Sequence, residues 1–175
     1  MSAADELNKK MNSFGKSGAA ARQPGGRPGG PGGYRDGPPA QLPKGYLDGG
    51  YFDDKGSVRK ELIIDWAEQL ARTFKDNGLY PSAMRNFFNK ARAIESSPDF
   101  EKNFSNLREQ VYAFVPLAAY QVGRKVVPEC FGKFIEKNVS LATKDPTSYS
   151  RGFVQHFKCV LAYFVGFGGE KGGSR

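Results

Sequence analysis

Apolar residues recur at intervals of three and four positions through most of the chain after residue 60, which is the spacing of one face of an α-helix. The first such stripe contains Ile63, Trp66, Ala67, Leu70 and Phe74. Asn77-Gly78 follows it and predicts a left-handed stop, whereas the turn-rich residues 51–56 precede it. A second helix is predicted over residues 82–95, directly behind Pro81.

Four further helices are predicted downstream. Ser97-Pro98 offers an N-cap and a first-turn proline for the third helix, which Pro116 is expected to break or kink. A short fourth helix covers residues 117–125, Pro128 opens the fifth, and the last begins at Thr147 or Ser148. Sustained strand-type alternation is missing from the sequence, so the predicted fold is all-α, a single bundle of five or six helices.

The composition changes sharply before the helical part. Residues 15–50 hold twelve Gly and six Pro, too few apolar side chains to offset the entropy of ordering the chain. We therefore predict a disordered Gly/Pro/Arg-rich tail over residues 1–48, a helical domain over 49–168 and a disordered C-terminal end over 169–175. The tail's arginines and tyrosine are typical of RNA-associating segments, although a merely solubilising leader has the same composition.

The chain is basic, with a net charge of +8 and a pI near 9.5. Nineteen Lys and Arg face fourteen Asp and Glu in residues 49–175, so the excess is not confined to the tail. A surplus of this size favours an anionic partner but is also found in proteins without one. Charge alone therefore leaves nucleic-acid binding and its absence equally open.

The second helix makes the charge more informative, because no acidic residue occurs between Asp76 and Glu95. Its apolar stripe comprises Met84, Phe87, Phe88, Ala91 and Ile94. Arg85, Asn89 and Arg92 fall on the opposite face, at i, i+4 and i+7. Arginine gives bidentate phosphate contacts and asparagine adds a neutral donor, so this face is interpreted as an RNA-backbone surface rather than an ordinary solvated one.

The fourth helix carries a smaller basic group. Tyr120 and Arg124 stand one turn apart, where they can stack on each other or face RNA together. Lys125 follows and extends the group by one charge.

Few other chemistries fit the composition. Cys130 and Cys159 lie far apart in apolar surroundings and are interpreted as inert buried thiols of a reducing cytoplasm. One histidine and no Cys-x-x-Cys pair exclude a protein-built zinc site, and no metal or cofactor is expected. Neither a signal peptide nor a membrane-spanning stretch is expected, because the longest apolar run, residues 159–167, is too short.

Arg151 and His156 form the one pattern that suggests catalysis. Their Arg-x4-His spacing is that of HEPN-type ribonucleases, and histidine is a natural acid or base near neutral pH. Gly152 replaces the polar residue that usually follows the motif arginine, and no second acid–base group accompanies His156. His156 is therefore interpreted instead as a helix-flank residue at the edge of the core.

Three motifs, taken in order, resemble a known family: Gly50–Gly56 with Glu61-Leu62-Ile63, then Pro81–Asn89, then Ala119-Tyr120-Gln121-Val122-Gly123-Arg124. Their order and spacing, with the Phe-rich last helix, are similar to those of the small helical subunit of the type III-A CRISPR effector, the Csm complex. The resemblance covers about residues 50–168. The long tail departs from the compact pattern of that family.

The resemblance implies a cytoplasmic, non-catalytic subunit present in several copies. Its implied partners are the CRISPR RNA, the target RNA, the backbone and large subunits, and neighbouring copies of itself. The family's motif arginines correspond to Arg85 and Arg124, whereas Asn89, Arg92 and Lys125 are added here from helix geometry. A HEPN-like ribonuclease and a free-standing RNA-binding bundle remain the alternatives.

Overall fold

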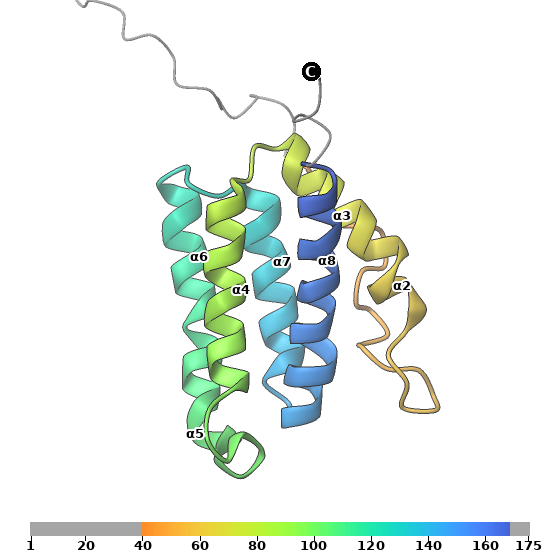
Figure 1. Cartoon of the computed structure of the whole chain (residues 1–175), viewed down its shortest axis with the longest axis vertical. Coiled ribbons are helices and arrows are strands. Elements are labelled where there is room, and N and C mark those ends of the chain that lie inside the picture. Colours follow the sequence, from red (N-terminus) through yellow and green to blue (C-terminus); the bar gives the residue numbers. More distant parts are fainter. Residues whose placement is uncertain (1–39, 169–175) are drawn as a thin grey trace, which may run out of the picture. The chain divides into compact units, whose positions relative to one another are not determined.

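The computed structural model describes residues 40–168, and these residues form a helical bundle (Figure 1). Its elements are α2 (Lys60–Ile63), α3 (Asp65–Asp76), α4 (Pro81–Glu95), α5 (Phe100–Tyr112), α6 (Phe114–Gly123), α7 (Glu129–Ala142), the π-helix η1 (Ser148–Val154) and α8 (Gln155–Gly166). Within this range the only extended pairing is an isolated bridge between Phe52 and Val58. The all-α prediction is confirmed.

The helices end where the local sequence requires it. Gly78 lies at φ +78° after α3, and the N–H groups of Gly78 and Leu79 donate to the carbonyls of Lys75 and Phe74, which is the Schellman arrangement. Pro81 occupies the first turn of α4, where its missing N–H costs no helical hydrogen bond. Both predicted signals are confirmed.

The break that we assigned to Pro116 lies three residues earlier, at Ala113 between α5 and α6. Proline lacks the N–H that would bind the carbonyl four residues before it, here that of Tyr112, and its ring crowds that carbonyl. The discontinuity therefore appears one turn before the proline. Similarly, α5 begins at Phe100 behind Asp99, rather than with Ser97 as its N-cap.

Aromatic side chains fill the core, as the apolar stripes predicted. α3 packs on α8, α6 packs on α7, and α7 packs on η1. Edge-to-face ring pairs join these elements, with centroids 5.3 Å apart for Phe74 and Phe131 and 5.4 Å apart for Phe134 and Phe157. This geometry suits the quadrupoles of the rings, so packing accounts for most of the phenylalanines.

The packed chain begins earlier than the boundary at residue 49. Tyr46 and Leu47, which we assigned to the tail, are 1% and 3% exposed. The Tyr46 ring lies 5.5 Å from that of Trp66, centroid to centroid, at an edge-to-face angle. The sequence analysis missed these two residues, because two buried side chains among glycines and prolines form no periodic apolar stripe. The predicted disorder of residues 1–39 and 169–175 lies outside the described residues.

The last helix begins close to the predicted Thr147 or Ser148: residues 146 and 147 are α-helical, and the next seven, Ser148–Val154, are π-helical. Gly152 lies there against Tyr51, and a Cβ at this position would come within 2.3 Å of the tyrosine ring. A glycine is therefore required for the N-terminal segment, residues 40–59, to pack on this helix.

Candidate nucleic-acid interface

α4 presents two chemically distinct faces. Met84, Phe87, Ala91 and Ile94 are buried, whereas Arg85, Asn89 and Arg92 are exposed. Phe88 lies at the border, half-buried, with its ring 5.5 Å from that of Phe157. The helical spacing thus placed the three polar residues correctly on the outer surface.

The charges on the outer face of α4 are only partly neutralised. Arg92 Nη1 donates to Glu95 Oε2 over 3.0 Å, and the two side chains are 52% and 24% exposed. Within residues 40–168, Arg85 has no ion-pair partner. Surface ion pairs of this kind contribute about 0.2–1 kcal/mol, so a phosphate can replace the Glu95 carboxylate at little cost.

Tyr120 and Arg124 form a surface pair on α6. The Arg124 guanidinium carbon lies 5.5 Å from the centre of the Tyr120 ring, and Nη1 is 3.3 Å from the tyrosine hydroxyl. Tyr120 is nevertheless 61% exposed. The sequence left open whether the two side chains contact each other or face RNA together; they contact each other, and a large aromatic side chain remains at the surface beside a cation.

Lys125 adopts a left-handed backbone conformation that is usually occupied by glycine. It lies at φ +56° after α6, and the N–H groups of Lys125 and Val126 donate to the carbonyls of Val122 and Gln121. This is the arrangement that Gly78 adopts after α3. Because a Cβ makes left-handed backbone unfavourable by about 1–2 kcal/mol, a lysine is costly at this position.

The two basic groups lie on different helices that run along each other. α4 begins and α6 ends at the same, upper end of the bundle in Figure 1. Their backbones do not pack directly, and they meet through side chains such as Phe87 and Phe114, whose ring centroids are 6.3 Å apart. The structure therefore places Arg85, Asn89 and Arg92 on one helix and Arg124 and Lys125 at the end of another.

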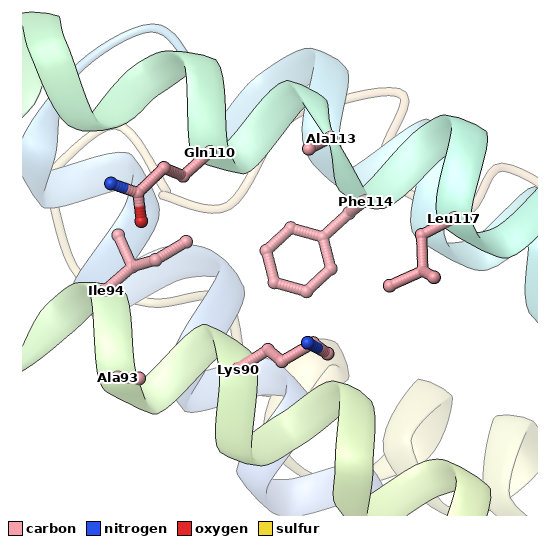
Figure 2. A pocket seen from close by; sticks show the side chains of 7 residues that line it. All are labelled: Lys90, Ala93, Ile94, Gln110, Ala113, Phe114 and Leu117. Carbon is pink, nitrogen blue, oxygen red and sulfur yellow. The ribbon is translucent and has the colours of Figure 1, made fainter.

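A groove of about 360 Å³ separates the helices (Figure 2). Lys90, Ala93, Ile94, Gln110, Ala113, Phe114 and Leu117 line it. Figure 2 shows Phe114 pointing toward α4 from the opposite wall, and the Lys90 chain extending along the α4 wall. Ala93 and Ala113 are exposed. Their short side chains leave this space unfilled.

Lys90 is the residue that our sequence analysis of the site missed. It directly follows Asn89, but helical spacing turns it by about 100° away from the strip of Arg85, Asn89 and Arg92 and toward α6. It is the only titratable residue that lines the groove. The acid-free stretch around it was the available signal, whereas the groove itself arises from tertiary packing.

His156 is a core residue, not a helix-flank residue as predicted. It is 0% exposed, with Nδ1 2.6 Å from the Leu62 carbonyl and Nε2 2.8 Å from the Tyr46 hydroxyl. Because the carbonyl can only accept, Nδ1 carries the proton and Nε2 accepts from Tyr46. Burial lowers the pKa of His156 to about 4, so the ring is neutral at pH 7.

The network around His156 continues to α7. Asn138 Nδ2 donates to the Tyr46 hydroxyl oxygen over 2.8 Å and to the Phe134 carbonyl, and the Tyr51 hydroxyl donates to Asn138 Oδ1 over 3.0 Å. Burial raises the pKa values of both tyrosines well above their usual range, so both keep their protons. His156 therefore helps to hold the N-terminal segment on the bundle through its hydrogen bond with Tyr46.

Arg151 does not share this environment. It is exposed, with its guanidinium carbon 5.7 Å from the centre of the Phe52 ring. A HEPN-type centre would need Arg151 and His156 beside the same substrate, but His156 is enclosed with both ring nitrogens engaged. This geometry argues against the ribonuclease alternative.

The remaining chemistry of the described residues is sparse. Cys130 and Cys159 are free thiols; Cys130 is buried as predicted, and burial raises its pKa to about 11, whereas Cys159 is half-buried. No group of three potential metal-ligating residues occurs in residues 40–168. Across the same range, every helix is too short or too polar to cross a bilayer.

Comparison with known proteins adds one match. The family described as Csm2 Type III-A matches residues 57–170, which is more than half of the chain. Searches of curated proteins and of solved structures returned no match.

Proposed function

Since the chain belongs to the Csm2 family, the small non-catalytic subunits of type III-A CRISPR complexes, we propose that it binds the target RNA backbone in the cytoplasm without cleaving it. Several copies would stack beside the subunits that hold the CRISPR RNA. Base pairing with the guide reads the sequence in RNA-guided recognition, so a subunit along the duplex needs only backbone contacts. The outer face of α4 carries this proposal, because it presents two exposed arginines on a helix whose only acid is Glu95.

Arg85 is the residue expected to contribute most to phosphate binding. Its guanidinium is exposed and has no acidic partner in residues 40–168, so it loses no existing ion pair when a phosphate approaches. Arg92 must first give up its ion pair with Glu95 to bind a phosphate, and Asn89 supplies a neutral donor between the two arginines. The three side chains recur at one-turn intervals, about 5–6 Å apart along the helix, which suits successive contacts to one strand.

Lys125 and Arg124 form the second part of the proposed surface. Unfavourable backbone conformations persist where the surrounding structure imposes them, and they cluster at functional sites. A glycine at position 125 would relieve the left-handed backbone but would remove a charge beside Arg124. A lysine at this costly position supports a role for its ammonium group, either toward RNA or toward a neighbouring subunit.

The direct test replaces Arg85 and Arg92 with alanine and measures RNA affinity as a function of salt. Two lost phosphate contacts should reduce the magnitude of the log-affinity against log-salt slope by roughly 1.4 for single-stranded RNA. The loss should be the same for every RNA sequence, because phosphates carry no base identity. In the assembled complex, target capture should decrease more than guide retention.

A control removes two exposed cations from other helices. Lys102 and Lys133 each pair with an acid three or four residues before them, and Arg92 pairs with one three residues after it. Their double alanine variant should keep the salt slope of the natural chain. If the Arg85/Arg92 variant folds, assembles and retains its slope, the outer face of α4 is not the RNA surface.

The HEPN-like and free-standing alternatives require separate experiments. Ribonuclease activity that survives purification and is lost in His156→Ala would support the former, with a refolding check because His156 is buried. Co-purification with other Csm subunits and a short CRISPR RNA would exclude a free-standing protein.

A further inference from the structure

We infer that the groove between α4 and the α5–α6 wall holds one unpaired nucleobase of the RNA that the outer face of α4 binds. This inference rests on the proposed function and adds a base-binding site to it. The α4 wall of the groove is formed by Lys90 and Ala93, which directly follow Asn89 and Arg92 in the chain. A strand whose phosphates lie along the outer face of α4 therefore passes the edge of the groove.

The chemistry of the lining fits a nucleotide. Phe114, Leu117 and Ile94 make an apolar floor, and Gln110 contributes an amide that both donates and accepts hydrogen bonds. Lys90 provides the only charge, and it has no acidic partner in residues 40–168. A nucleotide combines a flat apolar ring, polar ring edges and a phosphate, so each kind of group in the lining has a counterpart.

The size and openness of the groove agree with this occupant. Its volume of about 360 Å³ lies at the lower end of small-ligand sites, which bind compact groups rather than long peptides. Single-stranded RNA can turn an unstacked base toward a protein surface, and such bases are usually bound by apolar or aromatic side chains. The base would enter from the solvent side, between the exposed Ala93 and Ala113.

Filling the groove separates base binding from phosphate binding. Ala93→Leu adds apolar volume at an exposed helical position and leaves every charge unchanged; leucine is also a good helix former. Ala119→Leu, at an exposed position of α6 outside the groove, is the matched control. Thermal unfolding of both variants verifies that the fold is retained.

The assay uses the full chain and two single-stranded RNAs of about 12 nucleotides, a length within the usual site size of such proteins. One RNA is intact, and the other is abasic throughout, so both carry the same phosphates. The natural chain and Ala119→Leu should bind the intact RNA at least about fivefold more tightly. Ala93→Leu should reduce this ratio to near one, whereas the Arg85/Arg92 variant should weaken binding to both RNAs equally.

Each other outcome has one meaning. Equal binding of the two RNAs by the natural chain, or an unchanged ratio in Ala93→Leu, would overturn the base site and leave the proposed phosphate contacts standing. An unchanged ratio together with loss of subunit assembly in Ala93→Leu would assign the groove to a neighbouring protein. Failure to bind either RNA would overturn the proposed function itself.

Discussion

The hydroxyl of Tyr46 is the best point at which to test how the N-terminal segment is held. It accepts from Asn138 and donates to His156, and all three side chains are buried. Tyr46→Phe removes both hydrogen bonds but keeps the ring against Trp66 and Phe134. His156 Nε2 then has no donor, whereas Asn138 Nδ2 still reaches the Phe134 carbonyl.

The expected loss follows from these partners. A buried acceptor left without its donor costs about 1–3 kcal/mol, and losing the second hydrogen bond costs about 1 kcal/mol more. A total near 3 kcal/mol is a substantial part of the roughly 5–15 kcal/mol that stabilises a typical domain. For a domain of this size, it lowers the melting temperature by about 10 °C.

The assay is thermal and urea unfolding at pH 7.5, followed by circular dichroism. Tyr112→Phe removes the same atom from a residue that is 52% exposed, and it should change stability by less than about 0.5 kcal/mol. The urea m-value should stay constant, because the variant keeps the same packed chain. If Tyr46→Phe has the same melting temperature and urea midpoint as Tyr112→Phe, the hydrogen-bond network does not hold the N-terminal segment as we describe.

Three further predictions concern single positions. Because the pKa of His156 is about 4 in the folded chain and near 6.5 when unfolded, the unfolded state binds the proton first as pH falls. Its contribution to stability is therefore present above pH 6.5 and should decrease by about 2 kcal/mol between pH 6.5 and 5, a dependence that urea titrations of His156→Gln should lack. Gly152→Ala should destabilise the fold by about 2 kcal/mol, the usual cost of overpacking a core, because its Cβ would clash with Tyr51. Gly123→Ala, which has open space around it, should not destabilise the fold, and equal melting temperatures of the two variants would contradict this prediction. Lys125→Gly should stabilise the chain by about 1 kcal/mol while weakening RNA binding, and a gain in both would remove the argument for a functional lysine.

Most of the longer helices were predictable because they carry a regular apolar stripe, and α3 and α4 also carry a local signal at one end. Gly78 and Pro81 acted as expected on α3 and α4. The break at Ala113 could not be placed from the stripe alone, since it depends on which carbonyl the ring of Pro116 crowds. The burial of Tyr46 was missed because its partners, Asn138 and His156, are about a hundred residues away.

The candidate site was predictable in part for the same reason. Exposure of Arg85, Asn89 and Arg92 follows from helical geometry, and the structure agrees. The Arg92–Glu95 ion pair was also within reach of the sequence, since residues three apart on a helix are neighbours. The groove beside Lys90 was not, because it exists only where α5 and α6 approach α4 with alanines on both walls.

Cations outnumber acids on the flank formed by α4 and α6. α4 carries Arg85, Lys90 and Arg92 against Glu95, and Arg124 and Lys125 follow α6, which carries no acid. Of these cations only Arg92 has an ion-pair partner within residues 40–168. Solubility alone is served by mixed charges on every face, and it gives no reason for an excess of cations on one flank. A polyanion partner does, because each nearby carboxylate would repel the phosphates that the cations attract.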